Sequence, residues 1–188
     1  MLRIDFDRPQ EPIGSLPDVE ASIAIFSDYG KGALTYITDL IGMAKAQGMT
    51  VLVDPKGSDY RKYRGADVVK PNQDELRLMM GGWESEDQLF DKLKRLQEES
   101  QIPNILLTRA SEGISFLAGD GSLLHIHPQA KEVYDVTGAG DTAIAAFGAA
   151  LHRGSGMAES AQVANRAAGI AVGHFGTYQV TEGELFGH

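Results

Sequence analysis

Short apolar runs alternate with longer amphipathic segments along most of the chain. Short runs bounded by polar or turn residues are typical of buried strands, and apolar residues spaced three or four apart are typical of helices. Strand, helix and strand within about 30 residues predict a parallel pair joined by a right-handed crossover. The expected strands are 22–26, 51–53, 67–69 and 105–107, and the expected helices are about 33–47 (ended by Gly48), 73–80 and a segment that begins near Ser85.

Two segments have the two-residue period of strands with one buried face. Residues 2–7 alternate apolar and polar side chains, and a polar loop is expected at 8–20. Residues 114–117 and 123–127 flank Gly119–Gly121, which predicts a β-hairpin. His125 and His127 share one face of this hairpin, and the interpretation that needs fewest assumptions is an ordinary strand face rather than a metal site.

Two helices are expected in the last third of the chain, at 139–152 and 157–174. The first is apolar nearly all round, so it should be a buried central helix. Together with the βαβ pattern, this predicts an α/β layered fold with a mainly parallel sheet and an antiparallel addition. We find no internal repeat and no interdomain linker.

The composition narrows the functional classes. The chain has 188 residues, no cysteine, 43% apolar residues and a net charge of −9. The absence of cysteine excludes disulfides, thiolate metal sites and a cysteine nucleophile. The acidic balance argues against nucleic-acid or anionic-membrane partners. No apolar run approaches the ~20 residues that span a bilayer, and the first residues lack a signal-peptide core, so we expect a cytoplasmic protein.

The polar residues of unusual type follow the predicted strands. Ligands of open parallel sheets bind beyond the carboxyl ends of the strands, so these residues predict a single site at one edge of the sheet. They are Ser27, Asp28 and Lys31; Asp54 and Lys56; Lys70 and Asn72; Thr108 and Arg109; and the run 135–141.

The most informative segment opens the apolar helix. Gly138, Ala139 and Gly140 precede Asp141 in Asp-Val-Thr-Gly-Ala-Gly-Asp. Free backbone N–H groups at a helix N-terminus bind anions, and glycine permits close approach of a phosphate. Asp141 has two interpretations: an acidic first-turn residue that stabilises the helix dipole by ~0.3–1 kcal/mol, or a general base beside a phosphate cradle. The neighbouring glycines favour the base.

Several other signatures are absent. The sequence contains no Walker P-loop, no Gly-x-Gly-x-x-Gly after a strand, no His-Glu-x-x-His and no Gly-x-Ser-x-Gly. P-loop NTPases, zincins and α/β-hydrolases are therefore excluded.

These residues resemble the ribokinase-like (pfkB) carbohydrate kinases. Residues 135–141 are similar to the C-terminal signature of that family, and Asn72 to Glu75 is similar to its Asn-x-x-Glu motif. Within the family, the resemblance is to bacterial D-glycero-β-D-manno-heptose 7-phosphate kinases. It is carried by Ser27–Leu34, Asp54–Gly57, Tyr63–Ala66 and Glu132–Asp135 and extends over essentially the whole chain.

The resemblance implies a three-layer ribokinase-like fold and an ATP-dependent transfer to a sugar hydroxyl, with Mg²⁺ as cofactor. Asp141 matches the catalytic base, and Gly138, Ala139 and Gly140 match the anion hole. Asn72 and Glu75 match the pair that organises Mg²⁺ and phosphate through water. A helix-capping box explains the same pair equally simply, and both roles can hold together.

The remaining site residues are assigned in three groups. The resemblance places the nucleotide beside Thr108, Arg109, Gly113 and Asn165, although a polar helix-surface residue is an alternative for Asn165. It also places a monovalent cation at Asp135 and Thr137. From their positions at strand ends, Asp28, Lys31 and Lys56 are expected on the sugar side, with the two lysines meeting the 7-phosphate.

The resemblance also implies that residues 1–188 form the C-terminal, nucleotide-binding part of a kinase domain truncated at its N-terminus, with 1–7 a remnant of a lid strand. We therefore expect weak turnover by this chain alone and self-association into a homo-oligomer through exposed apolar surface. Two alternatives stay open: a kinase of another sugar or nucleoside, and a non-catalytic nucleotide-binding module.

Overall fold

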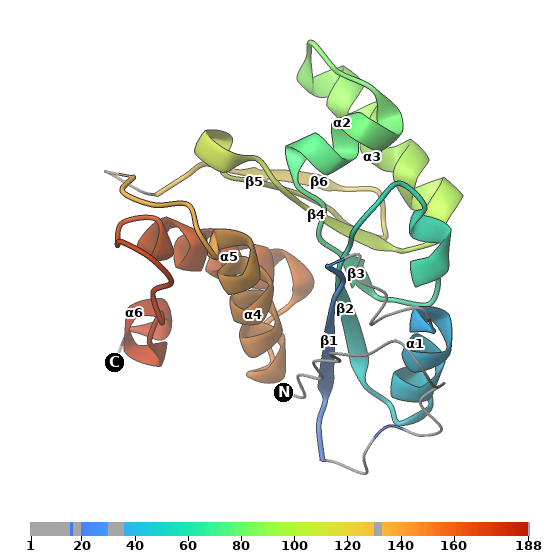
Figure 1. The fold of residues 1–188 in the computed structure, drawn as a ribbon, viewed down its shortest axis with the longest axis horizontal. Coiled ribbons are helices and arrows are strands. Elements are labelled where there is room, and N and C mark those ends of the chain that lie inside the picture. Colours follow the sequence, from blue (N-terminus) through green and yellow to red (C-terminus); the bar gives the residue numbers. More distant parts are fainter. Residues whose placement is uncertain (1–15, 17–19, 30–35, 130–132, 188) are drawn as a thin grey trace.

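The computed structural model describes residue 16 and residues 20–29, 36–129 and 133–187. In these residues a sheet of order β1-β2-β3-β4-β5-β6 forms the centre of the molecule (Figure 1). Strands β1 to β4 pair in parallel, and β5 pairs antiparallel with both β4 and β6, which confirms the predicted mainly parallel sheet and the hairpin. The strands are β1 (Ile23–Ser27), β2 (Thr50–Asp54), β3 (Val68–Val69), β4 (Asn104–Thr108), β5 (Ile114–Leu117) and β6 (Leu123–Ile126).

Helices cover both faces of the sheet, so the fold has the predicted three layers. In Figure 1, α1 lies to the right of β1 and β2, and α4, α5 and α6 lie to their left. The helices are α1 (Ile37–Ala46), α2 (Gln73–Met80), α3 (Glu86–Ser100), α4 (Ala139–His152), α5 (Met157–Ala171) and α6 (Glu182–Phe186), with 3₁₀ turns η1 (Tyr60–Tyr63) and η2 (Ala110–Glu112).

The alternation of side chains along the strands produces two separate cores. Phe26 and Val53 pack with α1, α2 and α3, whereas Ile23 and Leu52 pack with α4 and α5. A Cβ added at Gly148 of α4 would lie 3.2 Å from Leu52 and 3.3 Å from Ile23. Gly148 therefore lets α4 lie directly against the sheet, as expected of a buried central helix.

Most predicted elements are confirmed, with different ends. The described part of the first helix begins at Ile37, and Gly48 follows it with a φ of +76°. The last long helix ends at Ala171 rather than at 174. Helix α6 was not predicted, because it is short and depends on a Thr181–Glu184 capping box rather than on apolar periodicity. The predicted strand at 2–7 lies outside the described residues.

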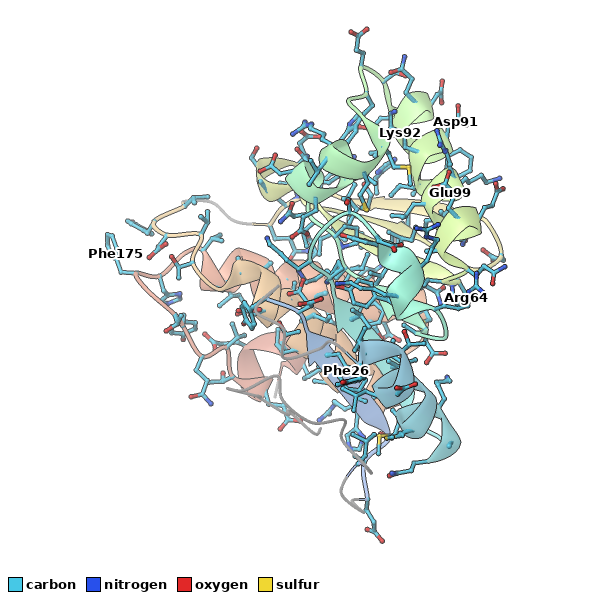
Figure 2. All side chains as sticks on the ribbon, turned by 45° about the vertical axis from the view of Figure 1, so that its right-hand side comes forward. Phe26, Arg64, Asp91, Lys92, Glu99 and Phe175 are labelled. Atoms are coloured by element: carbon cyan, nitrogen blue, oxygen red, sulfur yellow. The ribbon has the colours of Figure 1, made fainter. Side chains whose placement is uncertain are left out.

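β1 is the edge of the described sheet, but most of its apolar side chains are buried. Ile23, Ala24 and Phe26 are each exposed by 5% or less, and Figure 2 shows Phe26 inside the molecule. Ile25 of the same strand is only partly buried. Exposed large apolar side chains lie elsewhere, among them Phe175, which is 82% exposed and lies at the periphery (Figure 2). None of the described helices is long and apolar enough to cross a membrane.

Candidate active site

The carboxyl ends of the parallel strands lie next to the beginning of α4. Asp54 ends β2 and Lys70 follows β3. The Lys70 Nζ lies 3.1 Å from Asp54 Oδ1, and it would lie 3.1 Å from a Cβ added at Gly140. The structure therefore places a lysine ammonium against the first turn of α4.

The turn that opens α4 is suited to an anion. Gly138 is the N-cap with a φ of +75°, a left-handed conformation that favours glycine, and no side chain caps the helix. The first N–H groups of a helix lack intrahelical partners, so an uncapped N-terminus offers donors and a positive dipole end. Asp141 is exposed in this first turn. The predicted anion hole and base are thus adjacent to Lys70.

The Lys70–Asp54 pair is buried. The Lys70 side chain is 5% exposed and the Asp54 side chain 17%. Burial raises the pKa of Asp54, and the ammonium of Lys70 opposes this shift. The negative charges of Asp141 and Glu75 raise the pKa of Asp54 further. A buried cation beside the positive end of a helix is favourable only with anions close by, and a ligand phosphate would be one.

Asn72 and Glu75 form the capping box that the spacing predicted. Asn72 Oδ1 accepts the N–H of Glu75 at 2.9 Å, and Glu75 Oε2 accepts the N–H of Asn72 at 3.0 Å. The other carboxylate oxygen, Oε1, lies 3.3 Å from Lys56 Nζ. The structure confirms the capping interpretation and also places Glu75 and Lys56 at the same edge of the sheet.

The donor set here fits Mg²⁺ held largely through water. The described residues contain no group of three or more His, Asp or Glu side chains that could hold a metal directly. Mg²⁺ usually keeps several waters and binds one or two carboxylates together with substrate phosphates. Glu75, with a carboxylate oxygen that is not used by its capping box, suits this mode.

Thr108 and Arg109 lie beside the Asn72 loop. Thr108 donates its N–H to Pro71 O at 3.0 Å, and Gln73 Nε2 donates to Arg109 O at 3.2 Å. Gly113 ends the following turn, where a Cβ would lie 2.1 Å from Ile126 O. The structure therefore brings the predicted nucleotide-side loop to the site, and close packing against β6 explains why position 113 is glycine.

The guanidinium of Arg109 is held within the protein. It is bidentate to Glu86, with Nη1 and Nη2 at 2.9 and 2.7 Å from the two carboxylate oxygens. It also contacts Glu112 and Ser115 Oγ. Arg109 is 6% exposed. The side chain therefore fixes the loop, and its backbone is the part that faces the Asn72 segment.

Glu86 should make this cluster sensitive to acid. Its hydrogen bond from Arg109 lowers the pKa of Glu86 below the ordinary 4.5. A carboxylate with a depressed folded-state pKa stabilises the fold above its unfolded pKa, and that contribution is lost as pH falls through the folded pKa. We expect Glu86→Gln to reduce the loss of melting temperature on acidification below pH 4.5. The effect should be small because Glu86 is 56% exposed.

A control for this measurement is Glu99→Gln, which removes the partner of an exposed arginine, Arg95, on the same helix. Melting curves of the three proteins across the acidic range decide the matter. A wild-type curve parallel to that of Glu86→Gln would contradict the role of Glu86.

Ala110 has a φ of +48°, which is unusual for a residue with a Cβ. A left-handed conformation costs such a residue about 1–2 kcal/mol, and glycine loses about 0.4–1 kcal/mol more on ordering. We therefore expect Ala110→Gly to raise the free energy of unfolding by about 0.5–1 kcal/mol. Denaturant unfolding measures this, and a destabilised variant would show that the position is not strained.

Asn165 and the Asp135 segment lie near α5 and the end of β6. Asn165 is 3% exposed and its amide donates to His127 O at 2.8 Å, so its nitrogen joins α5 to the chain after β6. Asp135 Oδ1 accepts from the N–H and Oγ1 of Thr137 at 2.9 and 2.7 Å, and Oδ2 accepts from Gly176 N–H at 3.0 Å. The Thr137 hydroxyl lowers the pKa of Asp135. The Asp135 carboxylate therefore holds Thr137, the residue before the Gly138–Gly140 turn, and connects it to Gly176.

Of the residues expected on the sugar side, Asp28 is turned inward. Its carboxylate is 7% exposed and accepts from Lys62 Nζ at 2.8 Å and from Tyr63 Oη at 2.6 Å. Lys56 is on the surface, with its side chain 55% exposed. Lys31 lies outside the described residues.

Sequence reasoning included Asp54 and Lys70 in the predicted site without a specific role, and it assigned no role to Tyr63 or Glu86. Lys70 and Asp54 were visible only as polar residues at strand ends. Their pairing depends on the sheet register, in which β2 and β3 are neighbours. The sequence predicted only that Glu86 lies at the beginning of a helix, and nothing in it connects Glu86 with Arg109.

The chain spans about two fifths of the curated relatives it matches. It is 44% identical over 195 residues to the bifunctional protein HldE of Shewanella piezotolerans, an alignment of 98% of this chain and 40% of that protein. It is 43% identical to the protein of the same name from Hahella chejuensis, again over 98% of this chain and 40% of that protein.

Solved structures show the same fold. Arabidopsis thaliana ribokinase complexed with ribose and ATP superposes with a TM-score of 0.73 at 23% identity, covering 84% of this chain and 51% of that one. Escherichia coli phosphofructokinase-2 in complex with potassium superposes with a TM-score of 0.74 at 19% identity, covering 88% of this chain and 56% of that one. Residues 22–182 match the pfkB family carbohydrate kinase, so the glycine turn, Asp141 and the Asn72–Glu75 pair all lie within the matched region. The chain belongs to the pfkB family of carbohydrate kinases.

Proposed function

We propose that the protein carrying this sequence transfers the γ-phosphoryl group of ATP to a hydroxyl of D-glycero-β-D-manno-heptose 7-phosphate, giving the 1,7-bisphosphate and ADP. This reaction would serve ADP-heptose and lipopolysaccharide-core synthesis in the cytoplasm. The observation that carries the kinase chemistry is the uncapped turn Gly138–Gly140, with Asp141 exposed in it and Lys70 beside it. The sugar is supported by the HldE relatives.

Asp141 would act as the general base. Its carboxylate takes the proton of the attacking hydroxyl, the hydroxyl oxygen bonds to the γ-phosphorus, and the bond from that phosphorus to the β,γ-bridging oxygen breaks. Negative charge on the transferring group would be met by the N–H groups of the turn and by Lys70 Nζ, as phosphoryl transfer requires. Mg²⁺ would neutralise phosphate charge, with Glu75 and Asn72 orienting its water ligands.

The other predicted residues have supporting roles in this proposal. Thr108, the Arg109 loop, Gly113 and Asn165 would form the wall beside the nucleotide, and Asp135 with Thr137 would adjoin a monovalent cation. Lys56 and Lys31 would meet the 7-phosphate. Asp28 would act by holding its loop, because its carboxylate is already engaged.

We also infer that the 188 residues alone bind ATP but turn over slowly. The chain spans only 40% of its HldE relatives, and part of such catalysis comes from enclosing the acceptor and excluding water. Self-association into a homo-oligomer remains our proposal for the isolated chain, and light scattering at high concentration tests it.

A substrate panel tests the proposed function. The protein at its full natural length is incubated with Mg-ATP and either heptose 7-phosphate, ribose, fructose 6-phosphate or adenosine, and products are followed by ³¹P NMR. We expect phosphorylation of heptose 7-phosphate in clear preference. Preference for another acceptor would identify that acceptor as the substrate and contradict the proposal. ATP binding without any transfer would indicate a non-catalytic nucleotide-binding module.

A further inference from the structure

The hydroxyl of Tyr63 lies where the loops after β1 and β2 meet. Tyr63 is fully buried in η1. Its Oη donates to Asp28 Oδ2 at 2.6 Å and accepts the backbone N–H of Lys56 at 2.9 Å. Burial, and then the bond to Asp28, raises the pKa of Tyr63, so the phenol keeps the proton that it donates. One hydroxyl therefore joins Asp28 after β1 to Lys56 after β2, two of the residues expected on the sugar side.

Lys62 supports the same contact from the neighbouring position. Its Nζ lies 2.8 Å from the Asp28 oxygen that Tyr63 also contacts. Its backbone oxygen accepts from Thr38 Oγ1 of α1 at 2.8 Å, which ties η1 to that helix. Asp28 itself donates its N–H to Asp54 O at 2.8 Å. The carboxylate of Asp28 thus binds η1, and its backbone N–H binds the end of β2, so Asp28 connects η1 to the edge of the sheet.

Lys56 is the group that these loops present to solvent. Its side chain is 55% exposed, and its partner is Glu75 at 3.3 Å. The contact is long, and the Lys56 end of the pair lies in water although the Glu75 side chain is only 13% exposed. Water screens the exposed ammonium, so we expect it to exchange Glu75 for another anion at small cost. Tyr63 Oη accepts the backbone N–H of Lys56 at 2.9 Å and so fixes the backbone position from which the flexible side chain extends.

Tyr60 in the same turn provides an internal comparison. It is 2% exposed and packs edge-to-face on Tyr63, with ring centroids 5.6 Å apart. Its hydroxyl is buried and has no hydrogen-bond partner among the described residues. Both rings therefore pack the turn, but only the hydroxyl of Tyr63 connects the loops.

We propose that Tyr63 is a positioning residue for the phosphate of the acceptor: its hydroxyl fixes the loops of Asp28 and Lys56, and so fixes the point at which Lys56 meets that phosphate. The inference rests on the proposed function and deepens it. It makes the preference for a phosphorylated acceptor depend on a buried phenol that does not touch the acceptor.

The test is Tyr63→Phe in the protein at its full natural length, assayed with heptose 7-phosphate and with the same heptose lacking the phosphate. A hydrogen bond to a charged group justifies an expected fall of about tenfold in kcat/KM for heptose 7-phosphate. The preference for the phosphorylated sugar should fall by a similar factor, and KM for ATP should change by less than about twofold. A merely structural role would not alter the preference between the two sugars.

Two further variants keep the test decisive. Tyr60→Phe should leave all these parameters unchanged and be at least as stable as wild type, because it removes an unpartnered buried hydroxyl. Lys62→Met should lower the preference in the same direction, by less than Tyr63→Phe.

Wild-type turnover with an unchanged preference in a folded Tyr63→Phe, or equal losses for both sugars and for ATP, would overturn this inference alone. If Tyr63→Phe does not fold, an unchanged preference in Lys62→Met overturns it in the same way. Absence of wild-type turnover would overturn the proposed function, and this inference with it.

Discussion

Replacing Asp141 with asparagine should lower turnover by about 10²–10⁴-fold, the range that a positioned general base supplies. Asparagine is nearly isosteric but cannot accept the proton of the attacking hydroxyl. No side-chain hydrogen bond caps α4, and Asp141 is exposed. The variant should therefore keep the fold and the N–H groups that would bind phosphate. ATP affinity, measured by calorimetry, should therefore stay within about threefold, or roughly 0.7 kcal/mol.

A matched control separates the base from a helix-dipole role. Asp74 is also an acidic residue in the first turn of a helix, with its side chain 95% exposed. If Asp141 served only the dipole, Asp141→Asn and Asp74→Asn would each lose about 0.3–1 kcal/mol of stability and leave turnover intact. That pattern would contradict the account, whereas loss of turnover in Asp141→Asn alone supports it.

Replacing Lys70 with methionine should lower turnover by about 10²–10³-fold, comparable to the removal of one donor that stabilises transition-state charge. The Lys70 ammonium lies beside Gly140 at the turn that would hold the transferring phosphoryl group. Methionine keeps much of the buried aliphatic stem but carries no charge. The preference for ATP over ADP should also fall, because only ATP carries the γ-phosphate, and calorimetry with each nucleotide measures this.

The Lys45–Asp67 pair is a suitable control, since it also joins a lysine to an aspartate, with Nζ 2.8 Å from the carboxylate. Asp67 precedes β3 whereas Lys70 follows it, so the control pair lies at the other end of that strand. Lys45→Met should leave turnover and nucleotide preference unchanged. Because Lys70→Met leaves Asp54 buried without its cation, the double variant Asp54→Asn/Lys70→Met serves as a second test. Wild-type turnover in a folded double variant would remove Lys70 from the mechanism.

Features encoded within a few consecutive residues were predictable. Helix α2 runs over Gln73–Met80 as expected, because its apolar spacing and its Asn72–Glu75 cap are local. The position of Asp141 in the first turn of α4 was likewise predicted from the glycines before it. Family resemblance added chemical roles to these positions, and the register of the parallel strands places several of them at one edge.

Contacts between distant segments were not predictable. Lys70 was expected at the ligand edge of the sheet only as a polar residue after a strand. Its contacts with Asp54 at the end of β2 and with the start of α4 could not be predicted. Arg109 was expected to face the nucleotide, but its guanidinium turns to Glu86, 23 positions away. Asp28 appeared free to bind substrate, and the phenol of Tyr63 holds it inside. In each case the side-chain direction depends on tertiary packing.

The measurement that bears most directly on this account is a crystal structure of the chain with Mg²⁺ and a non-hydrolysable ATP analogue. We predict that the terminal phosphate lies within hydrogen-bonding distance of the N–H groups of the Gly138–Gly140 turn and of Lys70 Nζ, with the Asp141 carboxylate facing the side from which an acceptor hydroxyl would attack. A terminal phosphate bound elsewhere, or an Asp141 carboxylate turned away from it into protein contacts, would contradict the account.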